Sequence, residues 1–372
     1  MRWRVAAGGF APAVSAGWSL ANVGAVANGL SHAYGVSLGV IGLFTTALLA
    51  THGAIQVPAG RLCGRFGARL VGVAGLVVIG AASVAALTWR EAAFSIGMRA
   101  VAGVGTGLAF VAGSDYVRTM LGSAAAQGWY GGASIGGGGV ALALVPQWGS
   151  WEAPFATAAI VAAVGVAVLA AAPREEPRAR LAGALPTLSD RRLLRLAVMH
   201  SASFGLSVVI GNWVVTLLER GGGISAGRAG VAGALTLLLG IVTRPLGGRA
   251  YNHVRLLRAS FILGGAGTAI LAIASPLALA IAAAALVGLA AGLPFAAAFA
   301  GAARLRPDAP AAAVGLVNMT GAVTILLVTP LVGLSFSLPG NGRIGFAFVA
   351  ALWALAALSV PRRAPRSAPA AA

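Results

Sequence analysis

The chain has 372 residues, of which 59% are hydrophobic and only 9% are charged, a charged share well below that of soluble domains. Its formal net charge of +18 comes from arginine alone, because the sequence contains no lysine, and the single cysteine excludes an intramolecular disulfide. This composition excludes an ordinary soluble domain and indicates a protein that lies within a bilayer.

Apolar runs of about 20 residues, separated by Arg, Pro or Gly, are long enough to cross the hydrocarbon of a membrane. Arg2 and Arg4 precede the first run, which we interpret as a retained span and not as a cleaved signal peptide. The predicted spans are 6–27, 38–59, 70–89, 93–114, 124–146, 152–172, 195–218, 227–247, 257–275, 277–301, 311–334 and 343–361. The expected fold class is therefore an all-α membrane protein with twelve transmembrane helices.

The arginines are distributed unevenly between the two sides of these spans. If both termini are cytoplasmic, most arginines face the cytoplasm, as in integral proteins of the plasma (inner) membrane. The exceptions are Arg90, Arg220, Arg228 and Arg343 on the other side, and Arg99 and Arg244 inside or near the membrane. We expect anionic lipid headgroups to contact the basic loops. We do not expect nucleic acid as a partner, because aromatic residues do not alternate with the basic ones.

Two motifs recur six spans apart. QVPAGR at 56–61 matches RPLGGR at 244–249 with an offset of 188 residues, and GVGTGLAF at 103–110 matches GLAAGLPF at 288–295 with an offset of 185. Parallel repeats of this kind are common in transporters. They predict a six-helix half at 1–172, a cytoplasmic linker at 173–194, a second half at 195–361 and a cytoplasmic tail at 362–372.

The loop after the second span resembles the signature of the major facilitator superfamily. The family pattern G-x-x-x-D-R-x-G-R is similar to residues 60–69, in which Arg65 and Arg69 are present but Gly64 occupies the acidic position. Asp115, with Arg118 three residues later, could supply the missing carboxylate of the cytoplasmic gate. The resemblance implies two pseudo-symmetric halves around a cavity lined by spans one, four, seven and ten, and it implies a monomer.

Other spans resemble particular branches of that family. Residues 99–105 are similar to the fourth-span pattern R-x-x-x-G-x-G, and residues 128–137 resemble the fifth-span pattern of antiporters with Ala133 in place of proline. Arg244 resembles the eighth-span arginine of nitrate and nitrite porters, but the equivalent position in the second span is Gln56. Half of that anion clamp is missing, so nitrate specificity is not supported.

Arg99 and Arg244 are candidate functional residues, because a charge near mid-bilayer costs on the order of 3 kcal/mol and requires a partner or a watery cavity. Arg99 could serve gating or proton coupling, contact the solute, or extend its charged end to the membrane surface. Arg244 could contact an anionic or polar solute, with Gln56 facing the same cavity, or it could be the first cytoplasmic arginine after its span.

The remaining candidates are polar residues on apolar helices, each of which needs a hydrogen-bond partner because lipid provides none. They are Asn22, Tyr130, Asn318 and His200, and each could either bond to a neighbouring helix or line the cavity. His200 is also a candidate for proton coupling, because imidazole titrates near neutral pH.

Neither a metal site nor a cofactor site is predicted. The four histidines are scattered, the only cysteine stands alone, and no glycine-rich phosphate loop is present. The acidic residues lie mainly in loops, which disfavours an intramembrane enzyme. We therefore expect a secondary transporter that moves a small neutral or anionic solute by alternating access, coupled to protons or another ion. The alternatives are a proton-antiport exporter of hydrophobic compounds and a sensor that retains the fold without transport.

Overall fold

The structure is a computed structural model, and it describes residues 2–175, 190–274, 276–307 and 310–361. All regular elements in these residues are helical. The first half contains α1 (Arg2–Ala21), η1 (Gly24–Val26), α2 (Ala27–Tyr34), α3 (Leu38–Phe66), α4 (Ala68–Ala86), α5 (Ala92–Leu121), α6 (Ala124–Leu144), η2 (Val145–Trp148) and α7 (Ala153–Ala170). The second half contains α8 (Arg191–His200), η3 (Ser201–Leu206), α9 (Ser207–Gly222), α10 (Ala226–Leu238), α11 (Gly240–Ala250), α12 (Val254–Ile273), α13 (Leu277–Leu305), α14 (Pro310–Ser335), α15 (Arg343–Ala356) and η4 (Ala357–Ser359).

The prediction of an all-α membrane protein with twelve spans is confirmed. Ten helical segments of the described residues are long and apolar enough to cross a membrane, and α6 and the segment formed by α15 and η4 complete the twelve. Several boundaries differ from the prediction, and among the longer helices α3, α5 and α13 reach 29, 30 and 29 residues. These helices continue past their apolar runs into ends that carry arginine.

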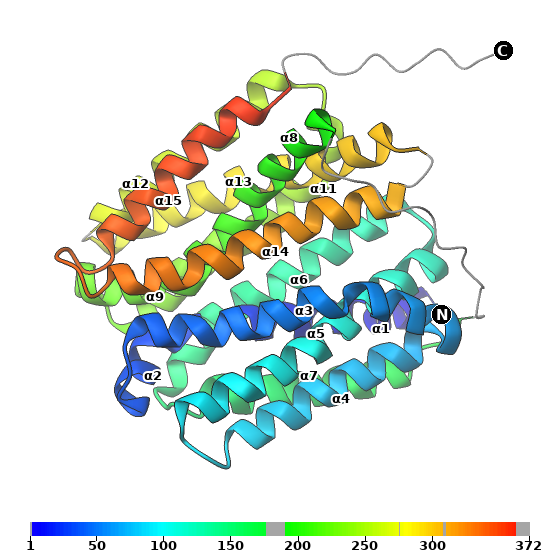
Figure 1. The fold of residues 1–372 in the computed structure, drawn as a ribbon, viewed down its shortest axis with the longest axis horizontal. Coiled ribbons are helices and arrows are strands. Elements are labelled where there is room, and N and C mark those ends of the chain that lie inside the picture. Colours follow the sequence, from blue (N-terminus) through cyan, green and yellow to red (C-terminus); the bar gives the residue numbers. More distant parts are fainter. Residues whose placement is uncertain (1, 176–189, 275, 308–309, 362–372) are drawn as a thin grey trace.

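The helices form two bundles that lie side by side (Figure 1), from α1 to α7 and from α8 to α15. We call the end of the molecule where α1 begins and α15 ends the terminal side, and the other end the opposite side. Helix α8 begins at Arg191, inside the predicted linker 173–194. Most of that linker, and the predicted tail 362–372, lie outside the described residues.

Apolar packing joins the two halves toward the opposite side. The largest buried cluster contains residues of both halves, whereas three smaller clusters belong to the first half alone. Helices α3 and α14 lie close together near α2 and diverge toward the terminal side (Figure 1). On the terminal part of α3, Gly60 and Gly64 have no neighbouring atom within 4 Å of the position that a Cβ would occupy. The terminal parts of α3 and α14 are therefore farther apart than their opposite ends (Figure 1).

Hydrogen bonds follow the same pattern as the apolar packing. Five of those within the described residues cross between the halves, and four of the five lie between the opposite side and the middle of the bundle. These four are Thr45 to Asn212, Thr46 to Leu326, Gln147 to Gly227 and Arg220 to Asn28. The fifth joins Arg244 to Gly131, nearer to the terminal side.

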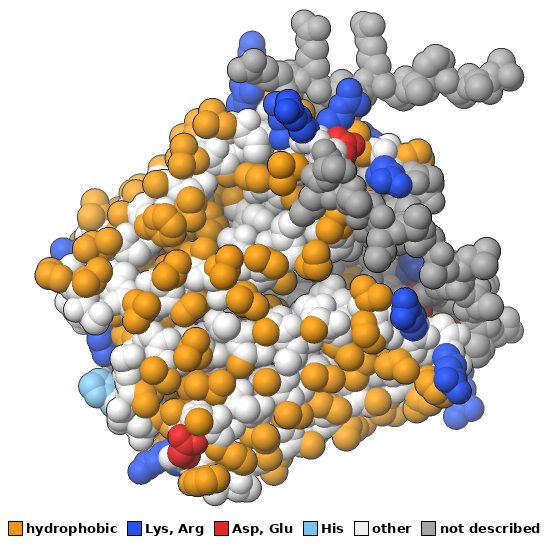
Figure 2. Space-filling view, in the orientation of Figure 1, with side chains coloured by type: hydrophobic (Ala, Val, Ile, Leu, Met, Phe, Trp, Pro, Cys, Tyr) orange, Lys and Arg blue, Asp and Glu red, His pale blue; other side chains and the backbone are white. Residues whose placement is uncertain are grey.

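The surface matches a bilayer environment. In Figure 2, hydrophobic side chains cover a broad band across the visible face, and charged side chains gather toward its ends. Four tryptophans are exposed near the ends of helices, namely Trp3, Trp89, Trp129 and Trp148. Tryptophan is typical of the membrane–water interface, where its amphipathic ring lies at the level of the headgroups.

Candidate functional site

Arg244 lies deep in the protein, at the boundary between the two halves. The residue is only 5% exposed, and Nη1 donates a hydrogen bond of 3.0 Å to the carbonyl of Gly131 on α6. Its guanidinium carbon lies 3.6 Å from the centroid of the Phe295 ring on α13, and Nε has no hydrogen-bond partner. In the described part of the chain, no carboxylate pairs with this cation. The site therefore holds a buried positive charge without a counter-ion.

Close approach between α11 and α13 places Arg244 over Phe295. A Cβ on Gly292 would overlap Thr243, and a Cβ on Gly247 would overlap the carbonyl of Leu293. Glycine at these two positions lets the helix backbones approach closely. The eighth span is interrupted at one residue, because α10 ends at Leu238 and α11 begins at Gly240.

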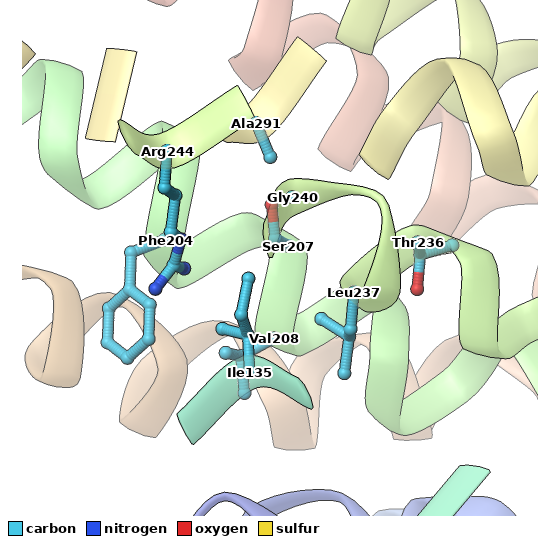
Figure 3. A pocket seen from close by; sticks show the side chains of 9 residues that line it. All are labelled: Ile135, Phe204, Ser207, Val208, Thr236, Leu237, Gly240, Arg244 and Ala291. Atoms are coloured by element: carbon cyan, nitrogen blue, oxygen red, sulfur yellow. The ribbon is translucent and has the colours of Figure 1, made fainter. Parts of the chain in front are cut away.

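A small pocket lies beside the guanidinium group. Its volume is about 10 Å³, enough for about one water molecule. The pocket lies between Ile135 of α6 and residues of the second half, namely Phe204, Ser207, Val208, Thr236, Leu237, Gly240, Arg244 and Ala291. Figure 3 shows the end of the Arg244 side chain beside the Phe204 ring, pointing toward Val208. The guanidinium group therefore faces the interface between the halves.

His200 packs against Phe204, which lines this pocket, and it is completely buried among aromatic rings. Its ring centroid is 4.6 Å from that of Phe299, 5.0 Å from that of Phe295 and 5.3 Å from that of Phe204. Neither ring nitrogen has a hydrogen-bond partner; the Asn318 side chain is next to the imidazole without hydrogen-bond geometry. We call His200, Phe204, Phe295 and Phe299 the aromatic cluster.

A π-helical turn in the seventh span contains Phe204 of the aromatic cluster. The seventh span is α-helical through His200, becomes a π-helix at Ser201–Leu206, and resumes as α9. A π turn adds a residue to the helical turn and is frequent at functional sites. Here it lies between His200 and the part of α9 that contacts the first half. A Cβ on Gly321 of α14 would be only 2.9 Å from both the His200 and Phe204 rings, so glycine is required for this packing.

Arg99 lies in a different environment, inside the first half. It is 3% exposed, and its three nitrogens donate to the carbonyl of Ser19 at 2.6 Å, the carbonyl of Phe44 at 3.3 Å and Oδ1 of Asn22 at 3.3 Å. Asn22 in turn donates to the carbonyl of Pro154 at 2.6 Å. These bonds connect α5 to α1, α3 and the start of α7. Asn22 and Arg99 are therefore brought together with each other and not with Arg244.

The other predicted solute contacts are divided between the halves. Asn318 joins His200, and Tyr130 adjoins the residue that accepts the Arg244 hydrogen bond. The Tyr130 hydroxyl itself donates to the carbonyl of Phe110 at 2.6 Å. Gln56 is half-buried on α3 and makes no hydrogen bond with a described residue.

The predicted gating residues lie at the terminal end of the first half. Arg118 pairs with Asp115 at 2.8 Å on the same helix, and Arg65 lies over the neighbouring Phe66 ring at 5.0 Å. Arg69 donates through Nη1 to the carbonyl of Ala172 at 2.7 Å. These contacts stay within the first half.

Sequence reasoning missed the part played by Glu175. Its carboxylate accepts a hydrogen bond of 2.8 Å from the backbone N–H of Arg69, in the first turn of α4. A carboxylate is favoured there, because the first turn of a helix has unpaired N–H groups and a positive partial charge. The loop with Gly64 at the acidic family position therefore has a carboxylate beside it from the end of the sixth span. Glu175 lies far from Arg69 in the sequence, so no local sequence pattern predicts this contact.

The aromatic cluster was also missed, although one signal was present. The fourth-span and tenth-span repeats both end in phenylalanine, at Phe110 and Phe295. Both rings lie in aromatic groups, because the Phe110 centroid is 5.3 Å from that of Tyr130 and 5.9 Å from that of His52. The repeat predicts two related halves, and its last position in each half carries the aromatic side chain.

Comparisons with known proteins agree with this architecture. The sequence model of the Major Facilitator Superfamily matches residues 12–249. A solved structure of a D-xylose-proton symporter is similar, with a TM-score of 0.78 and 14% identity over 98% of each chain. A mutant of the nucleoside transporter NupG has a TM-score of 0.74 and 12% identity over 96% of this chain and 98% of its own. A sequence search of curated proteins finds no significant match.

Proposed function

Because this chain belongs to the Major Facilitator Superfamily and is a transmembrane transporter, we propose that it moves a small anionic solute, with Arg244 as the principal solute contact. The observation that carries the proposal is the buried guanidinium between the halves, which no described carboxylate neutralises. A buried cation is stable only when it is paired, so a solute anion is its natural partner. A neutral solute could use the same donors but would leave the charge unbalanced.

The hydrogen bond between Arg244 and Gly131 would couple solute binding to movement of the two halves. Arg244 belongs to the second half and Gly131 to the first, so their hydrogen bond joins the two. A carboxylate or similar anion is a stronger acceptor than a neutral carbonyl. A solute that takes Nη1 from Gly131 removes this link, which is the one of the five hydrogen bonds between the halves that lies nearest to the terminal side.

Proton coupling is assigned to His200 in this proposal. The imidazole shares Phe295 with Arg244, so its charge state acts on the same guanidinium group through a short, apolar path. Imidazole changes charge near neutral pH, and an anion bound at Arg244 would favour the protonated ring. Solute and proton would then bind together, as in a symporter. The solved D-xylose-proton symporter has a similar fold, which is compatible with this coupling.

We further propose that the membrane is the plasma (inner) membrane and that the terminal side faces the cytoplasm. The support is the excess of arginine at the terminal ends of the helices, which follows the positive-inside rule. Labelling of single cysteines in intact cells, at Gly60→Cys and at Ser337→Cys, tests the orientation.

Flux into proteoliposomes tests the proposed function. An imposed proton gradient should drive uptake of small anions by the unmodified protein, and Arg244→Ala should abolish it, whereas Arg244→Lys should retain part of it. Arg90→Ala is the matched control, because Arg90 is exposed in a loop. Flux of lipophilic compounds that survives Arg244→Ala would overturn the proposal and favour the exporter.

A further inference from the structure

The aromatic cluster and Arg244 form one continuous group in the second half. Phe295 connects its members, since it stacks with the guanidinium group of Arg244 and contacts the rings of His200, Phe204 and Phe299. Four aromatic rings in mutual contact, one of them stacked on a cation, stand out here, because the surrounding helix interfaces are made mainly of glycine and alanine. The cluster is therefore a local chemical feature and not a general property of the core.

Two side chains in this group have buried nitrogen atoms without partners. These atoms are Nε of Arg244 and both ring nitrogens of His200. A buried donor or acceptor without a partner is unfavourable, and each such group in a native structure calls for an explanation such as a ligand or water. The pocket beside Arg244 has room for about one water, which is less than an organic solute needs.

The three phenylalanine rings of the cluster are less completely buried than the imidazole. Phe204, Phe295 and Phe299 are each only partly buried, while His200 behind them is fully buried. Across the interface, a Cβ on Gly131 would lie 3.7 Å from Nη1 of Arg244 and 3.8 Å from Cε1 of Phe295. These are ordinary van der Waals distances, so Gly131 of the first half lies against both the guanidinium group and the ring edge.

The first half supplies a related aromatic surface. Phe110 is the repeat equivalent of Phe295, it is also partly buried, and it packs on Tyr130 next to Gly131. The pseudo-symmetry of the halves thus places a phenylalanine on each of α5 and α13 at the same level. Only the second half adds a cation, because the repeat equivalent of Arg244 is Gln56. Such a site has aromatic faces in both halves and a single positive charge.

On this basis we propose that the site selects a small planar aromatic monocarboxylate, an inference that rests on the anion-transport function proposed above. The carboxylate would pair with the guanidinium fork of Arg244, for which a planar two-oxygen anion has the matching geometry. The ring would stack on the exposed faces of the phenylalanines, in the offset or edge-to-face arrangements that aromatic pairs prefer.

Other solute classes leave part of this group unused. An inorganic anion such as nitrate would engage Arg244 but not the rings. A sugar would need several hydrogen-bonding side chains, whereas three of the four residues in the aromatic cluster are phenylalanine. An organic cation would be repelled by the unpaired guanidinium group.

Competition for transport tests the selectivity. Proteoliposomes carrying the full chain take up radiolabelled benzoate, and the competitors are unlabelled benzoate, cyclohexanecarboxylate and nitrate. Cyclohexanecarboxylate is the matched probe, since it has the same charge and similar size but no aromatic ring. We expect benzoate to compete at about ten-fold lower concentration than cyclohexanecarboxylate, because stacked aromatic pairs contribute beyond the area they bury.

Two variants connect this preference to the cluster. Phe299→Leu should reduce the ten-fold preference to about two-fold, and it leaves Arg244 untouched because Phe299 makes no contact with the guanidinium group. Phe299→Tyr retains the ring and should retain the preference. The comparison of competitors on the unmodified protein needs no variant, so a folding defect in Phe299→Leu does not remove the test.

The outcomes separate this inference from the function on which it rests. If cyclohexanecarboxylate or nitrate competes as well as benzoate, and uptake still requires Arg244, then anion transport stands and the aromatic selectivity is wrong. If no anion is carried, the proposed function itself fails. If benzoate is preferred equally in Phe299→Leu and in the unmodified protein, the aromatic cluster is not the source of the selectivity.

Discussion

Arg99 and Arg244 are both buried arginines, yet their surroundings differ. Three donor atoms of Arg99 are used by the carbonyls of Ser19 and Phe44 and by Oδ1 of Asn22. Arg244 has one hydrogen bond and one aromatic contact, and its Nε is unpaired. We infer that the first arginine holds helices together and that the second is available to a solute.

We therefore expect replacement of Arg99 to lower the stability of the protein, with a smaller direct effect on transport. Arg99→Met keeps much of the side-chain volume but removes three hydrogen bonds between helices, and we expect a loss of about 2 kcal/mol in the free energy of unfolding. Unfolding in mixed micelles measures this quantity. Arg118→Met is the control, because Arg118 is 56% exposed and its ion pair with Asp115 contributes little. Full stability with abolished flux would instead place Arg99 in the transport cycle.

The sequence predicted which residues are unusual but not what they contact. An arginine in an apolar run is visible because of its cost, so Arg99 and Arg244 could both be selected as candidates. Their partners are backbone carbonyls and rings from helices distant in sequence, such as Ser19 and Phe295, and a carbonyl has no sequence signature. The distinction between a structural and an available guanidinium group therefore required the structure.

At the scale of the helix, two neighbouring glycines of α6 face different partners. A Cβ on Gly137 would overlap the backbone carbonyl of Val14 on α1, within the first half. A Cβ on Gly136 would lie 3.0 Å from Cδ1 of Ile241 on α11, across the interface between the halves. The contact within a half is backbone to backbone and rigid, whereas the contact between halves ends on a flexible side chain.

The two corresponding alanine variants form a matched pair. Gly137→Ala should lower the free energy of unfolding by about 2 kcal/mol, because α1 and α6 must separate to make room. Gly136→Ala should change it by less than about 1 kcal/mol, since Ile241 can change rotamer and alanine favours the helix. Thermal denaturation followed by size-exclusion chromatography compares them. Equal losses in both variants would contradict the difference in rigidity.

The N-terminus of α5 gives a pH-dependent prediction. Backbone N–H groups of Ala93 and Phe94 donate to the Glu91 carboxylate and lower the pKa of that group below its usual value. A lowered pKa in the folded state contributes stability that is present above the usual carboxyl pKa and is lost as the pH falls through the folded value. The stability difference between the unmodified protein and Glu91→Ala should therefore be present at pH 7 and disappear in acid.

Glu152 supplies the control for this measurement. It occupies the same position before α7, but its side chain makes no capping hydrogen bond. Glu152→Ala should leave the thermal midpoint nearly unchanged at pH 7. A constant effect of Glu91→Ala from neutral to acid pH would show that the carboxylate does not act as a cap.

Hydrophobic runs predicted where helices lie, but not their internal irregularities. The runs located every span, because length and composition alone separate a membrane helix from a loop. The π turn at Ser201–Leu206 and the interruption after Leu238 lie inside apolar runs. At the π turn, Gly321 of another helix approaches His200 and Phe204, and the periodicity of one segment does not contain that information.

For the molecule as a whole, alternating access requires the opposite side to open. Helices α3 and α14 approach closely there, because a Cβ on Gly39 would lie 2.6 Å from Cδ2 of Leu334. Gly39→Cys combined with Leu334→Cys, in a Cys63→Ala background, should form a disulfide under mild oxidation. Flux should stop in the oxidised protein and return after reduction, as measured in proteoliposomes. Undiminished flux with complete cross-linking would show that this side does not open.

The two-half architecture was predicted because the motif repeat and the span count agree. The conformation of the halves could not be predicted in the same way. It depends on which contacts between α3 and α14, or between Arg220 and Asn28, form at one time. A transporter sequence must be compatible with at least two such sets of contacts, so it does not specify one of them alone.

The concentration of arginine at the terminal side has a further consequence for the cycle. Both halves carry guanidinium groups there, at the ends of α3, α5 and α13 and at the starts of α8 and α12. Closing this side brings like charges together, and at physiological salt their repulsion extends over about 8 Å. Ionic strength therefore controls the balance between the two conformations. At low ionic strength we expect the conformation that is open to the terminal side to be favoured. Added salt should reduce this preference, because it screens the repulsion.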